Sequence, residues 1–154
     1  MLHGTMALSH NVAAQTSNPA QPQPEFGLWY DETGRGAIEI APCGTNVCGR
    51  IVWLRNPLSQ RGTPLRDINN PNAADRNNPI CGLQVLGRLS RQPDGSLDGG
   101  WVYDPKVGKS YNVEVRQAGP NKLAVRGYLN VKLLGRTLSW TRAPSDLPRC
   151  DTAL

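Results

Sequence analysis

GWVYDPKVGKSYNVEVR, residues 100–116, is the clearest structural signal in the chain. In its second half the apolar residues Tyr111, Val113 and Val115 alternate with polar ones. A period of two places every second side chain on one face of a β-strand. A proline and a glycine between the two halves suit a tight turn. The stretch therefore predicts an antiparallel β-hairpin.

Similar β-prone runs lie on both sides of this hairpin, at residues 26–30, 35–41, 48–55, 122–129 and 136–142. The 16 glycines and 13 prolines of the chain predict frequent turns between them. Consecutive hairpins form a meander, and closing a meander removes its exposed edges. We therefore predict an all-β fold, a single antiparallel up-and-down barrel of about eight strands.

The first 24 residues differ from the rest. They contain no Lys or Arg, and the Gln- and Pro-rich stretch 15–24 predicts a flexible leader. The apolar segments 6–8 and 12–14 fit the tail of a signal peptide and a small-residue cleavage site, although the charged start is missing. We expect a disordered leader or signal-peptide remnant over residues 1–24 and one barrel domain over residues 25–154.

The four cysteines favour disulfides over a metal site. Four residues separate Cys43 from Cys48, whereas Cys81 and Cys150 are distant. Zinc sites in short chains usually need two close Cys or His pairs, and this chain has one. Of the three pairings that four cysteines allow, we favour Cys43–Cys48 with Cys81–Cys150. Disulfides form in oxidising compartments, so we expect a periplasmic or secreted protein.

Charge and hydropathy bear on the partners. The net charge is +5, but Lys and Arg are spread singly from Arg35 to Arg149, which is typical of a solvated basic surface. We therefore expect no nucleic-acid partner. No apolar run approaches the ~20 residues of a membrane-spanning helix, so we expect no such span. The oligomeric state is left open.

Enzymatic chemistry finds little support. The only histidines, His3 and His10, lie in the leader, so a Ser-His-Asp or Cys-His site would lack its base. Four carboxylates lie close together in the sequence: Asp67, Asp75, Asp98 and Asp104. Their spacing does not fix the separation that a catalytic pair needs. We predict no enzyme, no cofactor and no metal, and a hydrolase that uses Asp67 or Asp104 is our weakest alternative.

Aromatic residues on the predicted strands suggest a binding pocket. Most tryptophans in a small β-core simply pack, but some can line an apolar pocket at a barrel mouth. The two candidate arginines would anchor an anionic headgroup, although strand parity also allows Arg126 to point to solvent. The residues expected to bind the ligand are Trp53, Trp101, Tyr103, Trp140, Arg126 and Arg136.

Residues 56–79 form a polar segment that is long for a loop in a compact domain. Such loops are usually functional or act as lids. We expect Asp67, Asn70 and Arg76 to carry its role.

Several motifs together resemble one protein family, over about residues 26–142. They are Gly27-Leu-Trp-Tyr30, Ile80-Cys-Gly-Leu83, Gly99-Gly-Trp-Val-Tyr-Asp-Pro105, Gly108-Lys109, Val125-Arg-Gly-Tyr128, Leu134-Gly-Arg-Thr137 and Trp140-Thr-Arg142. This pattern resembles a bacterial family of uncharacterised small exported proteins with a lipocalin-like (calycin) barrel. In the long loop, Asn72 and Asn78 replace an acidic residue and an arginine of the family pattern. The resemblance implies the fold and export, and it leaves the function open.

The lipocalin resemblance also implies a contact at the base of the barrel. In that signature a Gly-x-Trp tryptophan plugs the base, and an arginine from the last strand covers its ring. Trp29 and Arg142 match these positions, and the first and last strands of a closed meander are neighbours. Arg136 is the competing partner.

We therefore expect a non-enzymatic barrel that binds a small apolar or anionic amphipathic ligand. The alternative is an envelope protein-interaction module with a filled barrel that docks through loop 56–79. The volume of the interior separates the two, because a solid core leaves no room for a ligand.

Overall fold

The computed structural model describes residues 23–153, so the leader predicted over residues 1–24 lies outside the described residues except for its last two. The described residues contain no helix that is long and apolar enough to cross a membrane. The strands are β1 (Gly27–Tyr30), β2 (Gly36–Cys43), β3 (Asn46–Leu54), β4 (Gln84–Arg91), β5 (Leu97–Asp104), β6 (Lys109–Gly119), β7 (Lys122–Tyr128) and β8 (Arg136–Arg142). Three short 3₁₀ helices are η1 (Ala73–Asp75), η2 (Lys132–Leu134) and η3 (Asp151–Ala153).

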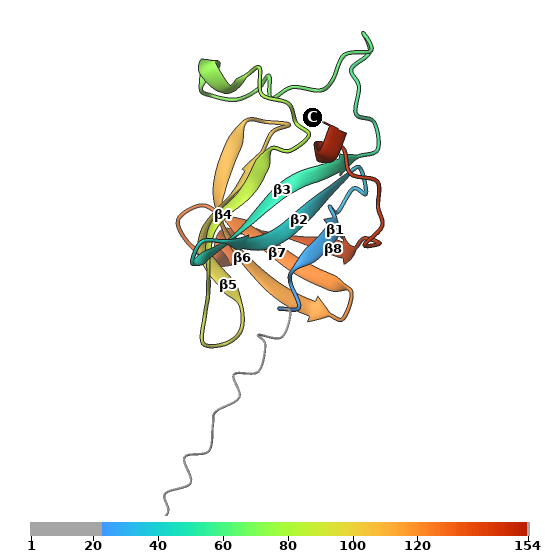
Figure 1. The fold of residues 1–154 in the computed structure, drawn as a ribbon. Helices are drawn as coiled ribbons and strands as arrows, with labels where there is room; N and C mark the ends of the chain where they lie inside the picture. The colour runs from blue at the N-terminus through green and yellow to red at the C-terminus, as the bar shows by residue number, and fades with distance from the viewer. Residues whose placement is uncertain (1–22, 154) are drawn as a thin grey trace, which may run out of the picture.

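The eight strands form a closed antiparallel barrel (Figure 1), which confirms the predicted fold class. Each strand pairs with its neighbours in the sequence, and the short β1 closes the barrel by pairing with β8. At this seam Trp29 lies opposite Arg142, and Tyr30 lies opposite Thr141. Most of the connections are short, so a strand pairs most readily with the next strand in the sequence.

The connections divide the barrel into two ends. The turns at residues 44–45, 92–96 and 120–121 lie at what we call the closed end, and the turn between β4 and β5 is at the bottom of Figure 1. The remaining connections, at residues 31–35, 55–83, 105–108 and 129–135, start from the opposite end, which we call the open end. Residues 55–83, which we call the long loop, extend beyond the strands at the top of Figure 1.

Large apolar side chains fill the closed half of the barrel. Trp29, Leu89, Leu97, Val115 and Leu123 are fully buried there and belong to one cluster. The alternation predicted for β6 is present, because Val113 and Val115 face this core. Burying a side chain of this size contributes about 1.5–3 kcal/mol, so this half supplies much of the stability.

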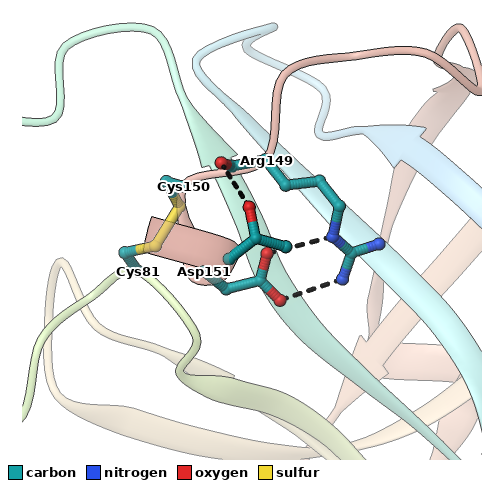
Figure 2. Close-up of a disulfide and its surroundings, with 5 residues drawn as sticks. Cys81, Arg149, Cys150 and Asp151 are labelled. Atoms are coloured by element: carbon teal, nitrogen blue, oxygen red, sulfur yellow. Dashed lines mark hydrogen bonds and ion pairs between the residues drawn. A yellow bond between two sulfur atoms is a disulfide. The ribbon is translucent and has the colours of Figure 1, made fainter. Parts of the chain in front are cut away.

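Both disulfides are those predicted from the cysteine spacing. Cys43–Cys48 joins the two strands of the β2–β3 hairpin, near the closed end. Cys81–Cys150 joins the end of the long loop to the C-terminal segment (Figure 2). No free cysteine occurs among the residues that the structure describes.

The C-terminal segment is held against the outside of the barrel. The backbone N–H of Cys150 donates to the carbonyl of Val52 at 2.7 Å. Arg149 forms ion pairs with Glu39 at 2.6 Å and with Asp151 at 2.9 Å; Figure 2 shows the second pair. These contacts and the disulfide fix residues that follow the last strand of the barrel.

Candidate ligand-binding cavity

A cavity of about 800 Å³ occupies the open half of the barrel. Its deep wall is apolar and consists of Ile38, Ile51, Val85, Val125, Leu138 and Trp140. Gly36 and Gly127 also line it, where a larger residue would project inward. The glycines and the short side chains of Val85 and Val125 leave space at this level, whereas leucines and Trp29 fill the closed half. A volume of this size is in the usual range for small-molecule sites.

Charged groups surround the mouth of this cavity. We call them the charged rim, and they are Asp31, Glu32, Arg35, Arg66, Asp104, Lys106 and Arg136. Arg136 is exposed, and its Nη2 lies 3.5 Å from Glu32 Oε2. An exposed pair at this distance contributes little stability, so Arg136 is available to an anionic group. Polar groups thus lie at the mouth, and apolar groups lie inside.

The long loop covers part of the mouth through Leu65, Ile68 and Asn69. Asp67 between them is fully buried. The Tyr103 hydroxyl donates to Asp67 Oδ1 at 2.7 Å, and Asn70 Nδ2 donates to Oδ2 at 2.8 Å. Burial and the bond to Asp67 raise the pKa of Tyr103 to about 12. Asp67 therefore fastens the long loop to β5.

A second contact fastens the long loop to the β5–β6 turn. Asn69 Nδ2 donates to the carbonyl of Lys106 at 2.9 Å. Gly108 has a φ of +66°, and a Cβ there would lie 1.8 Å from the carbonyl oxygen of Asn69. Only glycine fits such an approach, so the turn and the loop depend on each other.

Three of the predicted ligand-binding residues line the cavity: Tyr103, Trp140 and Arg136. Of the predicted loop residues, Asp67 and Asn70 form the fastening described above. Arg76 acts within the loop, where its Nε donates to the carbonyl of Asn70 at 2.8 Å.

Trp53 differs from its predicted position, because it faces outward and does not line the cavity. Ala37 lies opposite Trp53 while Ile38 lies opposite Ile51, so Val52 is an extra residue in β3. This bulge shifts the alternation by one position. Trp53 consequently packs edge-on against Tyr30 on the outer face, with ring centroids 5.5 Å apart.

Trp101 also lies outside the cavity. Its ring covers Gly87 on the neighbouring strand, where a Cβ would come within 2.4 Å of the indole. Trp101 lines a separate hollow of about 510 Å³, which Asp67, Asn70 and Asp75 of the long loop also line. Its neighbour Val102 takes the inward position.

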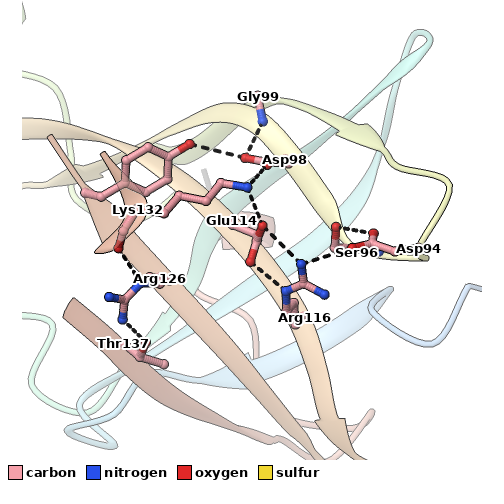
Figure 3. A network of polar contacts seen from close by, with 10 residues as sticks. Asp94, Ser96, Asp98, Gly99, Glu114, Arg116, Arg126, Lys132 and Thr137 are labelled. Atoms are coloured by element: carbon pink, nitrogen blue, oxygen red, sulfur yellow. Dashed lines mark hydrogen bonds and ion pairs between the residues drawn. The ribbon is translucent and has the colours of Figure 1, made fainter. Parts of the chain in front are cut away.

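Arg126 lies on the outer wall of the barrel (Figure 3). Its Nε donates to the carbonyl of Lys132 at 2.8 Å, and its Nη1 donates to Thr137 Oγ1 at 2.8 Å. The alternative that strand parity allowed for Arg126, an outward side chain, is the one observed. Arg126 thus contacts the β7–β8 loop and does not line the cavity.

The same loop is held by a network of charges on the outer wall (Figure 3). Lys132 forms ion pairs with Asp98 and Glu114. Arg116 pairs with Glu114 at 2.6 Å and with Asp94 at 3.0 Å. Hydrogen bonds from Arg116 and Lys132 hold the pKa of Glu114 below its usual value. Asp98, one of the four carboxylates considered for catalysis, is therefore part of a structural network.

Sequence reasoning missed several cavity residues. Tyr111 shares a face with Val113 and Val115 and lies nearer the open end, so strand parity could have identified it. Leu65 and Ile68 belong to a loop without periodicity, and no sequence signal points them toward the cavity. Among the described residues, no cluster of three or more His, Cys, Asp or Glu side chains could hold a metal ion.

Two interior tryptophans have different surroundings. The guanidinium carbon of Arg142 lies 3.9 Å from the Trp29 ring centroid, so the predicted contact is present. Trp29 Nε1 donates to the carbonyl of Glu25 at 2.9 Å, and Arg142 Nη1 donates to that of Phe26 at 2.8 Å. Trp140 borders the cavity instead, and its Nε1 has no hydrogen-bond partner among the described residues.

Comparison with known proteins agrees with this architecture. A family described as an uncharacterized protein conserved in bacteria (DUF2147) matches residues 27–142. A solved structure, protein HP1028 from the human pathogen Helicobacter pylori, described as belonging to the lipocalin family, is similar with a TM-score of 0.66. The two chains are 21% identical over 79% of this chain and 84% of that one, and at this identity the similarity shows the fold alone. No curated protein matches the chain.

Proposed function

The chain belongs to the DUF2147 family of uncharacterized bacterial proteins, and because the family carries no assigned activity, we propose from the site itself that it binds a small, partly apolar molecule without catalysing a reaction. The observation that carries this proposal is the cavity of about 800 Å³ in the open half of the barrel. The lipocalin-like fold is consistent with such a role, as an analogy.

The chemistry of the wall supports the proposed ligand class. Apolar side chains line the interior, so burying an apolar ligand there is favourable by about 25 cal/mol per Å². The charged rim offers Arg35, Arg66, Lys106 and Arg136 to an anionic headgroup. An amphipathic molecule would match both regions.

The cavity in the open half favours ligand binding over the alternative of a filled barrel that docks through loop 56–79. Asp67 and Asn69 hold two points of the long loop against the barrel, which supports its role as a cover of the cavity. We further propose that the protein is exported to the periplasm or secreted, since two disulfides are stable in an oxidising compartment.

Filling the cavity tests the proposed function. Leu138 lines the cavity, and Leu138→Trp should occupy part of it. Ser139→Trp adds the same ring at the next position of β8, where the exposed side chain faces outward. The probe is N-phenyl-1-naphthylamine, excited at wavelengths that tryptophan does not absorb.

We expect the probe to bind the natural protein and Ser139→Trp equally, and Leu138→Trp at least about tenfold more weakly, because the added ring takes the probe's space. Equal binding by Leu138→Trp, or no binding by the natural protein, would overturn the proposal. Circular dichroism of each variant checks that the barrel is intact.

A further inference from the structure

The indole Nε1 of Trp140 is the one buried side-chain polar atom, among the residues that the structure describes, without a hydrogen-bond partner. A buried tryptophan normally finds a partner for its N–H, because an unpaired donor loses the bond that it would make to water. The residue is only 4% exposed, so solvent at the surface does not fill this role. An orphaned donor of this kind requires a physical explanation.

The position of Trp140 suggests that explanation. It borders the ligand cavity from β8, between Leu138 toward the mouth and Arg142 at the closed end. It lies opposite Leu123 of β7, which is fully buried. The side chains that share the deep wall are aliphatic and offer no acceptor. The cavity is the open space that borders this residue, so an acceptor held in it would reach the N–H once the ring moves.

We propose that the molecule bound in the cavity carries an uncharged hydrogen-bond acceptor at its buried end, and that the Trp140 N–H donates to it. The class comprises apolar molecules with a ketone, ester or amide oxygen. This inference rests on the proposed function and names the ligand class of the same site. Neighbouring atoms cover Nε1, so the ring shifts slightly as the acceptor enters.

The acceptor is uncharged because of the distribution of charge in the site. The cations that line the cavity, Arg35, Arg66, Lys106 and Arg136, all belong to the charged rim. A carboxylate at the deep wall would lose its hydration without gaining a counter-charge, whereas a carbonyl needs only one donor. Any anionic group of the ligand therefore stays at the rim, and the neutral oxygen lies inside.

The test uses two probes that differ in one atom group. 2-Nonanone and 2-methyl-1-nonene have the same shape, with a carbonyl oxygen in one and a methylene in the other. Each is titrated against bound N-phenyl-1-naphthylamine in the natural protein, in Trp140→Phe and in Trp53→Phe. Trp53→Phe is the matched control, because Trp53 lies outside the cavity.

The measured quantity is the ratio of ketone affinity to alkene affinity, which cancels the general effect of cavity size. We expect Trp140→Phe to lower this ratio about tenfold, since one hydrogen bond to a buried donor is lost. Trp53→Phe should leave it unchanged. If both probes bind and Trp140→Phe keeps the natural ratio, the inference is overturned while the proposed function stands. If N-phenyl-1-naphthylamine does not bind the natural protein and neither 2-nonanone nor 2-methyl-1-nonene binds it, both the inference and the proposed function fail.

A measurement on the natural protein covers the case in which Trp140→Phe does not fold. In ¹H–¹⁵N spectra with assigned indole signals, the Trp140 N–H proton should move downfield with 2-nonanone and not with 2-methyl-1-nonene. The Trp53 signal should stay in place with both. Equal responses of the Trp140 signal to the two probes would overturn the inference.

Discussion

Trp29 and Trp140 lie on neighbouring strands of one barrel, and both are buried, yet their surroundings differ. Trp29, in the closed half, has Arg142 over its ring and a carbonyl for its N–H. Trp140 borders the cavity and has no partner for its N–H. One half of the barrel is a packed core, whereas the other half borders open space.

This difference has a simple origin in side-chain size. In the closed half the inward positions carry Trp29 and fully buried leucines, which fill the space. In the open half, smaller residues such as Val85, Val125 and Gly127 take some of these positions. The same barrel geometry thus gives a solid core at one end and a cavity at the other. The packed core and the proposed binding site therefore lie at different ends of the barrel.

The largest expected loss of stability comes from a substitution in the closed half. Trp29→Ala removes a fully buried ring and leaves a cavity, so it should lower the free energy of unfolding by roughly 3–5 kcal/mol. Trp140→Ala should cost at least about 1 kcal/mol less, because its ring borders existing space and its unpaired N–H disappears. Urea unfolding measures both. A greater loss from Trp140→Ala would contradict the division of roles.

The two disulfides sharpen the same comparison. Replacing Cys81 and Cys150 together by alanine should cost roughly 4 kcal/mol, whereas replacing Cys43 and Cys48 should cost about 2 kcal/mol. The reason is loop length, since the sequence separations are 69 and 5 residues. Urea unfolding under non-reducing conditions gives both values. The reverse order would show that chain entropy does not dominate here.

The smallest expected effect concerns the fastening of the long loop at the open end. The folded protein favours the neutral phenol of Tyr103, whose pKa is raised to about 12 from 10.0. Its bond to Asp67 therefore contributes stability below pH 10 that is lost as the pH rises through about 12.

The absorbance of tyrosinate at 295 nm tests this fastening. The difference between the titrations of the natural protein and Tyr103→Phe should have its midpoint near pH 12. A midpoint near pH 10 would mean that the hydroxyl is free and the loop is not fastened by it. Tyr30, Tyr111 and Tyr128 cancel in the difference.

The sequence was sufficient to predict the barrel because alternation and turns are local signals. Residues 109–116 and 136–142 show both, and strands form there as expected. β4 could not be assigned, and Arg88 within it has a φ of 57°, which breaks regular alternation. The closure through Trp29 and Arg142 came from family resemblance rather than from periodicity.

The site was harder to predict than the fold, for reasons that concern individual residues. A single extra residue, Val52, turns Trp53 outward, and no composition signal announces such a bulge. The contacts of Asp67 and Asn69 depend on how the long loop folds back onto β5, which sequence patterns do not encode. The partnerless N–H of Trp140 is a property of its neighbours in space.

The most direct test of the central claim is the mass of the native protein purified from its own host. The account predicts a non-covalent adduct in native mass spectrometry, absent after denaturation and absent from Leu138→Trp, with Ser139→Trp behaving like the natural protein. Loading detergent-free protein with 2-nonanone should restore the adduct in the natural protein but not in Leu138→Trp. A bare polypeptide mass both from the host and after loading would contradict a ligand-binding open half.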